Sequence, residues 1–170
     1  MSNSHQIILR PFQLSDCKPI TQYANNRLVW QNLRDRFPSP YTEIDALMFI
    51  ELVSRNNPLT EFAIDLNGTA IGAAGIILKE DVYRLNGEIG YWIGQEYWGK
   101  GIGTQVVARL TQKAFEEFNL LRVYAEVFDK NKASARVLIK NGFKQEAILK
   151  KAIYKDGEIL NLLIFSKLKE

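Results

Sequence analysis

The sequence predicts one α/β domain over residues 1–170, of α+β type, with a mixed, mostly antiparallel sheet flanked by helices. Segments rich in branched apolar residues alternate with segments of helical apolar spacing along the chain. The turn sequences Asn67-Gly68 and Asp156-Gly157 lie between apolar runs and are typical of hairpins, which join antiparallel strands. A length of 170 residues is enough to bury a core and leave a ligand cleft.

The first third of the chain predicts one strand, two helices and a loop. In order, they are a strand at 7–12, a helix at 15–26, a loop at 33–41 and a helix at 42–53. Ser15 is the expected N-cap of the first helix. Thr42 followed by Asp45 resembles a capping box at the start of the second. Pro38 and Pro40 interrupt regular structure between the two helices.

The rest of the chain predicts strands interrupted by two helices. The expected strands are 61–66, 69–78, 88–94, 121–128, 143–149 and 158–167. The expected helices are 102–118, with apolar residues along one side, and 132–141, which ends near Gly142. No repeat, linker or low-complexity tract divides this pattern, so a single domain is expected.

Composition narrows the class of protein. Hydrophobic residues make up 46% of the chain and charged residues 24%, which is ordinary for a folded globular protein. The net charge of +3 is too small and scattered to indicate nucleic-acid binding. No apolar run approaches the roughly 20 residues that span a bilayer. The chain contains one cysteine, Cys17, and one histidine, His5. A cytoplasmic, metal-free protein without a disulfide or a membrane segment is therefore expected.

A glycine-rich stretch, EYWGKGIGT at 96–104, directly precedes the helical pattern that begins at 102. Glycines before a helix let an anionic ligand approach the backbone, and the first helical amides then face a phosphate. A nucleotide-binding P-loop is disfavoured because Gly101 stands where Ser or Thr should hold magnesium. The dinucleotide fingerprint also fails, because Thr104 or Val106 occupies the place of its third glycine.

The stretch resembles the pyrophosphate-binding loop of the GNAT acetyltransferase superfamily, Q/R-x-x-G-x-G/A, with Gly101 and Gly103 as its two glycines. Trp98 stands where the family usually has Gln or Arg, but Tyr-Trp-Gly before the loop is common in the branch that resembles the RimJ/RimL ribosomal-protein N-acetyltransferases. Further segments that resemble this branch are 33–41, 88–93, 131–134 and 141–143. The resemblance covers the chain from Ile7 to Phe165.

The resemblance implies transfer of an acetyl group from acetyl-CoA to an amine. In such folds the central strands at 88–94 and 121–128 splay, and the pantetheine arm enters between them. Backbone amides of the first strand would bind the arm, those of the glycine loop would bind the pyrophosphate, and Asn131 would contact pantetheine or a water. The implied cosubstrate-binding residues are Tyr91, Trp92, Ile93, Trp98, Gly99, Lys100, Gly101, Ile102, Gly103, Thr104 and Asn131.

The chemistry then requires a base for the ammonium proton and a donor for the leaving thiolate. Glu88 is the first candidate for the base, acting through water; the alternative is a structural pair with a neighbouring strand residue. Glu126 on the facing strand is the second candidate. Many GNAT enzymes carry a tyrosine acid seven residues after the position of Asn131, but Leu138 stands there. Ser134 is the candidate donor of a hydrogen bond to the thiolate. The alternative is that Ser134 has only a structural role, packed in the first turn of the helix.

Two classes of function remain. One is an N-acetyltransferase acting on a protein N-terminal amine or on a small amine, and the same branch contains polyamine, amino-acid and antibiotic acetylators. The other is a module that binds acetyl-CoA without turnover, which the loss of the tyrosine to Leu138 suggests. The segment 34–41 is expected to shape the acceptor end. A homodimer is left open, and neither nucleic acid nor membrane is an expected partner.

Overall fold

The computed structural model describes residues 6–170, so His5 lies outside the described residues. The strands are β1 (Ile8–Arg10), β2 (Glu61–Leu66), β3 (Thr69–Leu78), β4 (Asn86–Ile93), β5 (Arg122–Phe128), β6 (Lys144–Lys155) and β7 (Glu158–Leu168). The α-helices are α1 (Cys17–Ala24), α2 (Arg27–Trp30), α3 (Glu43–Ser54), α4 (Ile102–Glu116) and α5 (Lys132–Lys140). Short 3-10 turns are η1 (Leu14–Asp16), η2 (Asp81–Tyr83) and η3 (Gln95–Tyr97). The short helix α2 was not predicted.

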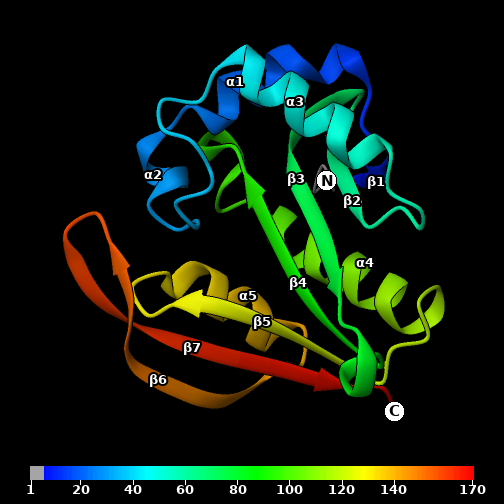
Figure 1. Ribbon diagram of the computed structural model, residues 1–170, viewed down its shortest axis with the longest axis vertical. Coiled ribbons are helices and arrows are strands. Elements are labelled where there is room, and N and C mark those ends of the chain that lie inside the picture. The colour runs from blue at the N-terminus through cyan, green and yellow to red at the C-terminus, as the bar shows by residue number, and fades with distance from the viewer. Residues whose placement is uncertain (1–5) are drawn as a thin grey trace, which may run out of the picture. The chain divides into compact units, whose positions relative to one another are not determined.

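Seven strands form one sheet in the order β1-β2-β3-β4-β5-β7-β6 (Figure 1). The pairs β1-β2, β2-β3, β5-β7 and β6-β7 are antiparallel, and β4-β5 is parallel. The mixed, mostly antiparallel sheet with flanking helices is thus confirmed. Backbone contacts group the chain into two compact units. One holds the chain up to Gly75 together with Tyr91–Val106, and the other holds Ile76–Gly90 and Val107–Glu170.

Both predicted hairpin turns are confirmed. Asn67 and Gly68 have φ of 54° and 85°, and Asp156 and Gly157 have φ of 53° and 80°. Two successive residues at positive φ make a type I′ turn, whose twist matches that of the strands it joins. Asn, Asp and Gly occupy this region at little steric cost.

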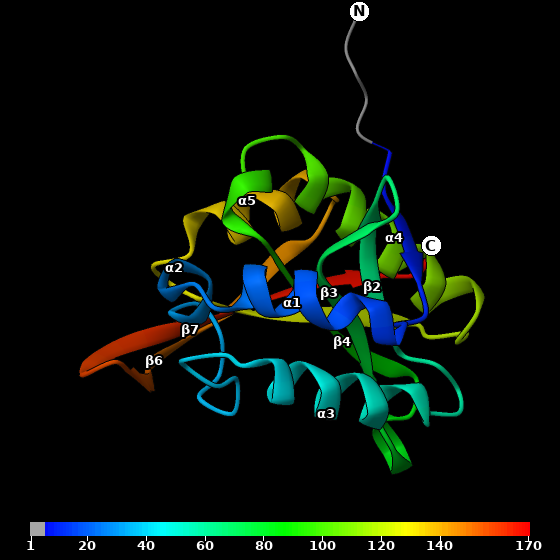
Figure 2. The same cartoon turned by 90° about the horizontal axis from the view of Figure 1, so that it is seen from above.

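In the first unit, α1 and α3 run side by side (Figure 2). The predicted capping box of α3 is confirmed, because Thr42 N donates to Asp45 Oδ2 at 2.8 Å and Asp45 N donates to Thr42 Oγ1 at 3.3 Å. The strands contribute small side chains to the shared core, which lets helices pack close to the sheet. The buried members of this core are Phe12, Ile20, Ala24, Tyr41, Ala46, Ile50, Val53, Ala63, Ala70 and Ala73.

An ion-pair cluster holds the start of this unit. Arg10 donates to both carboxylate oxygens of Asp16, at 2.7 and 2.8 Å, and to Asp65 Oδ2 at 2.6 Å. Burial raises the pKa of Asp16, but the bonds from Arg10 and from the Gln13 backbone outweigh it and leave that pKa below its ordinary value. Asp16 is also the N-cap residue of α1, and the prediction of Ser15 was wrong, because η1 already includes Ser15.

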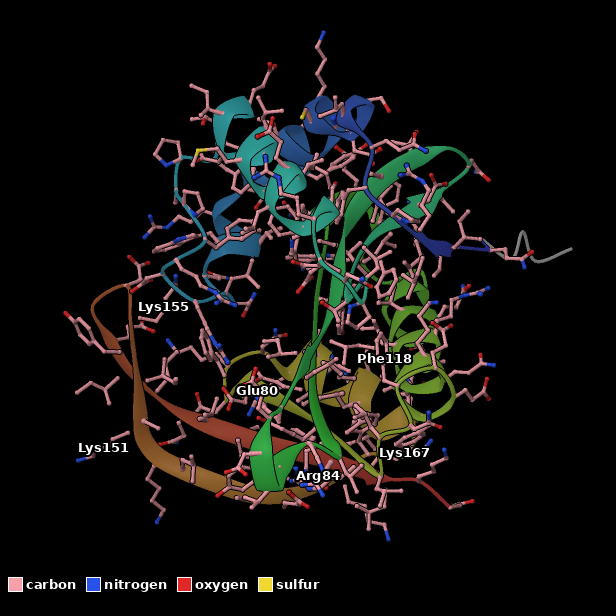
Figure 3. The ribbon with its side chains drawn as sticks, turned by 45° about the vertical axis from the view of Figure 1, so that its right-hand side comes forward. Glu80, Arg84, Phe118, Lys151, Lys155 and Lys167 are labelled. Carbon is pink, nitrogen blue, oxygen red and sulfur yellow. The ribbon has the colours of Figure 1, made fainter. Side chains whose placement is uncertain are left out.

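In the second unit, β6 extends to Lys155, beyond the end predicted at residue 149. The ladder with β7 is irregular between Leu149 and Ile153, and Lys151 there has φ of 55°. The backbone N–H of Lys151 donates to Asn161 Oδ1 at 2.9 Å, which replaces a ladder bond, and its side chain is exposed (Figure 3).

Among residues 6–170, none of the helices has the length and apolar character needed to cross a membrane.

Candidate functional site

The glycine loop lies between η3 and α4 in the first unit. Gly99 and Gly101 have φ of 74° and 76°, and a Cβ atom at either position would meet nothing within 4 Å. Their conformation therefore favours glycine, while the space in front of both backbones is open. The loop leads into the first turn of α4, a helix of 15 residues, whose first amides lack intrahelical acceptors and carry the positive end of the helix dipole. This arrangement fits a bound phosphate group.

Side chains of the first unit hold the residues in and just before this loop in place. Trp98 Nε1 donates to the carbonyl oxygen of Ile93 at 2.8 Å. Tyr97 contacts Tyr23 of α1 edge to face, with ring centroids 5.4 Å apart, and their hydroxyl oxygens lie 2.9 Å apart. Lys100 Nζ lies 5.5 Å from the centroid of the Tyr97 ring. The hydrogen bond with Tyr97, aided by burial, raises the pKa of Tyr23 to about 12, so Tyr23 stays neutral near pH 7.

The segment 33–41 packs through aromatic rings. Phe37 lies 4.9 Å from the ring of Tyr41 and 5.6 Å from that of Trp92 on β4, measured between centroids. Trp30 Nε1 donates to the carbonyl oxygen of Phe37 at 3.1 Å. Tyr41 is buried, and burial raises its pKa to about 12. These contacts tie the segment to β4 and give the side chain of Trp92 a packing role.

Glu88 lies on β4 in the second unit, opposite Tyr124 in the parallel register with β5. Glu88 is buried, with 8% of its surface exposed. Its Oε2 atom lies 3.1 Å from Lys79 Nζ and 3.4 Å from the hydroxyl oxygen of Tyr124. Burial lowers the pKa of Lys79, but hydrogen bonds with Tyr124 and Glu88 outweigh it and leave that pKa above its ordinary value. A lysine cation therefore holds the Glu88 carboxylate in position. This pairing agrees with the structural alternative considered for Glu88, although the sequence did not identify Lys79 or Tyr124 as the partners.

Glu126 lies on the same face of the β4-β5 pair as Glu88. Alternate residues of a strand point to opposite faces, so Glu126 shares the face of Tyr124. The other face of β5 carries the buried residues Val123, Ala125 and Val127. Glu126 itself is exposed. The two predicted candidates for the base are therefore brought to one face, with Glu88 buried and Glu126 in contact with solvent.

The start of α5 places the remaining two candidates. Asn131 is its N-cap, and its Oδ1 atom accepts a hydrogen bond from the backbone N–H of Ser134 at 3.1 Å. The capping bond uses the backbone of Ser134, so the half-buried hydroxyl is not needed for the cap. Leu138, one turn further on, is 1% exposed and belongs to the core. The position where a tyrosine acid was expected is thus a packing position.

Glu61 of β2 is a titratable residue that the sequence analysis missed. It lies opposite Gly75 of β3, and a Cβ atom at Gly75 would stand only 2.1 Å from Glu61 Oε2, so the carboxyl group rests on the β3 backbone. Burial raises the pKa of Glu61 to about 7, against the opposing charge of Arg36. No sequence signal marks this arrangement, because it depends on which residue of β3 faces Glu61.

This raised pKa predicts a pH-dependent stability. The ordinary pKa of the group is 4.5, so between about pH 4.5 and 7 the folded protein binds more protons than the unfolded chain. The free energy of unfolding should therefore fall as pH rises through this window, by up to about 3 kcal/mol from Glu61. Urea unfolding at pH 5 and pH 8 should show that Glu61→Gln gains stability relative to wild type mainly at pH 8.

The matched control is Glu51→Gln, which removes the same charge from the exposed side of α3 in the same unit. It should leave the pH dependence of the wild type unchanged. Equal loss of stability between pH 5 and pH 8 in the wild type and in Glu61→Gln would contradict the assignment of the titration to Glu61.

Comparison with known proteins gives consistent results. Residues 6–144 match the family described as an acetyltransferase (GNAT) domain. An N-acetyltransferase of Bacillus licheniformis, p20, is 28% identical over 98% of this chain and 94% of its own. The spermidine N(1)-acetyltransferase of Escherichia coli K12 is 25% identical over 96% of this chain and 86% of its own. RimL, a ribosomal L7/L12 α-N-protein acetyltransferase solved with coenzyme A, has a TM-score of 0.85 at 19% identity and covers 97% of this chain and 95% of its own.

Proposed function

Because the chain belongs to the GNAT acetyltransferase family, we propose that it binds acetyl-CoA and transfers the acetyl group to a primary amine. The observation that carries this proposal is the loop before α4, where Gly99 and Gly101 adopt positive φ with open space in front of them. The amides of Gly99, Lys100, Gly101, Ile102, Gly103 and Thr104, with Trp98, would hold the pyrophosphate. Tyr91, Trp92 and Ile93 would bind the pantetheine arm through their backbone, and Asn131 would contact it or a water.

The proposed reaction begins with removal of a proton from the acceptor's ammonium group. Glu88 would take this proton through a water, and Lys79 and Tyr124 would keep its buried carboxylate ionised and oriented. The amine nitrogen then attacks the thioester carbonyl carbon, the C–N bond forms and the C–S bond breaks. The nitrogen loses its second proton, and the CoA thiolate takes up a proton and leaves as the free thiol. The hydroxyl of Ser134 would donate a hydrogen bond to the departing thiolate. Glu126 is the alternative base.

The acceptor is proposed to be a protein N-terminal amine or a small amine. RimL acts on a ribosomal protein and the Escherichia coli relative on spermidine, so both classes deserve a direct test. The test is release of free thiol from acetyl-CoA with polyamines, amino acids, aminoglycosides and short peptides. Acetylation of one class names the acceptor. Absence of turnover with every amine, together with tight binding of CoA, would instead favour a binding module, the alternative that Leu138 suggests.

Two further parts of the proposal concern the cellular location and the oligomeric state of the protein. We propose a cytoplasmic location, where acetyl-CoA is available and the single thiol of Cys17 stays reduced. A homodimer is tested by light scattering at several protein concentrations, with a mass of twice 19.5 kDa as the supporting result.

The variant Ser134→Ala should lower kcat roughly tenfold, the size of one hydrogen bond to a charged group. The affinity for CoA and the melting temperature should stay near wild type, because the capping bond of α5 uses the backbone of this residue. Steady-state kinetics and thermal unfolding measure both. A kcat equal to that of the wild type would assign Ser134 to packing alone.

A further inference from the structure

The carboxyl group of Glu61 lies against the backbone of the β2-β3 strand pair. It faces Gly75 in the antiparallel register and rests on the glycine's backbone, where any larger residue would place a Cβ atom. Along the same face, the residues two positions away on each strand are Ala63 and Ala73, which are buried in the core. Glu61 is therefore an acidic group set among small apolar side chains, at the end of a face otherwise built for packing.

In the described part of the chain, this carboxyl group has no hydrogen-bond or ion-pair partner, although it is half-buried. The positive charge of Arg36 acts on Glu61 from a distance and favours its ionised form. Arg36 is exposed, however, and within residues 6–170 it forms no salt bridge with Glu61. A half-buried carboxylate without a partner is costly, and an ammonium group would compensate it through charge-assisted hydrogen bonds.

The segment that carries Arg36 also carries aromatic rings. Phe37 follows Arg36 directly and contacts both Tyr41 and Trp92. Aromatic faces and a carboxylate are the two protein groups that attract organic ammonium ions. All of these residues belong to one unit, and the segment 34–41 is the one expected to shape the acceptor end.

We propose that Glu61 binds the second, non-reacting ammonium group of an alkyl diamine or polyamine acceptor. This inference rests on the proposed function and makes it more specific. The amine that attacks the thioester must lose its proton, so it cannot keep a strong bond to a carboxylate. A second amine on the same alkyl chain keeps its proton and suits Glu61. A thin methylene chain would also reach a carboxyl group that lies close to the sheet backbone.

The sharpest test compares 1,4-diaminobutane with 1-aminobutane, which has the same alkyl chain and lacks only the second amine. The wild type should acetylate the diamine with a kcat/KM at least about tenfold higher. Glu61→Gln should remove this preference by raising KM for the diamine about tenfold, with little change in kcat. A purely structural role would affect both amines equally. Glu51→Gln is the charge-matched control and should keep the wild-type preference.

A second variant moves the carboxyl group instead of neutralising it. In Gly75→Ala the new Cβ atom would overlap Glu61 Oε2, and this end of a flexible side chain can shift at small cost. The variant should fold and should lose the preference for the diamine, as Glu61→Gln does. Retention of the preference in both variants would overturn the inference.

Direct binding separates this inference from the proposed function. Calorimetry of 1,4-diaminobutane with the CoA-loaded protein should show affinity about tenfold lower in Glu61→Gln, whether or not any amine is acetylated. Turnover of aminobutane or peptides with no effect of Glu61→Gln on diamine binding would overturn the role of Glu61 and leave acetyl transfer standing. A larger loss with a lysine-containing peptide than with the diamine would overturn the assignment to a small amine.

Discussion

Replacement of Glu88 by glutamine is expected to lower kcat for acetyl transfer by about 10²–10⁴-fold, the usual contribution of a general base. Glutamine keeps the shape of the side chain and cannot accept the proton of the ammonium group. The affinity for CoA should change little, because Glu88 has no proposed contact with it. Steady-state kinetics with the acceptor found in the panel, and calorimetry with CoA, measure the two effects.

Two controls separate the proton transfer from the ion pair. Glu116→Gln removes an exposed carboxylate at the end of α4 and should leave kcat unchanged. Lys79→Gln breaks the bond of 3.1 Å to Glu88 but keeps the carboxylate, so it should lower the melting temperature and reduce kcat far less than Glu88→Gln. If Glu88→Gln folds and keeps kcat within a factor of two, the base is not Glu88, and Glu126→Gln becomes the variant to measure.

Gly101→Val is expected to weaken CoA binding about 100-fold, or roughly 2.7 kcal/mol. Two causes act together. A φ of 76° is unfavourable for a β-branched residue, so the loop would shift away from its present conformation. The side chain would also enter the open space in front of the backbone, where the pyrophosphate is proposed to lie. Calorimetry with CoA measures the affinity, and circular dichroism verifies the fold.

Gly157→Val is the matched control, because Gly157 has φ of 80° and a Cβ atom there would also meet nothing within 4 Å. It carries the same backbone strain in a hairpin turn that has no proposed ligand. It should lower stability to a similar degree and leave the affinity for CoA unchanged. A folded Gly101→Val with wild-type affinity would contradict the proposed role of the loop.

Features that depend on a few consecutive residues were predictable from the sequence. The two hairpin turns follow from residues that tolerate positive φ, and the capping box of α3 follows from hydrogen bonds three residues apart. The glycine loop belongs to the same class, because Gly99 and Gly101 adopt the conformation that glycine allows. Backbone sterics and short hydrogen bonds act within one or two turns of chain, so a local pattern is enough to reveal them.

Other features depended on contacts between different secondary-structure elements or connections, which no single local pattern reveals. Arg10 binds the carboxylate of Asp16, and Asp16 rather than Ser15 is the N-cap residue of α1. Lys79 and Glu88 lie nine positions apart, and they meet because the chain turns back between β3 and β4. At the irregular point of β6, the backbone N–H of Lys151 donates to the side chain of Asn161 on β7.

Glu61 shows the difference most clearly. Extrapolated from the hairpin turn, where Leu66 faces Thr69, the register would place Ala74 opposite Glu61; the irregularity between Ile64 and Asp65 places Gly75 there instead. The sequence alone therefore determined the turns, the helix cap and the glycine loop. The tertiary structure decided the partners and burial of the titratable groups, because strand register and desolvation arise only when distant segments pack together.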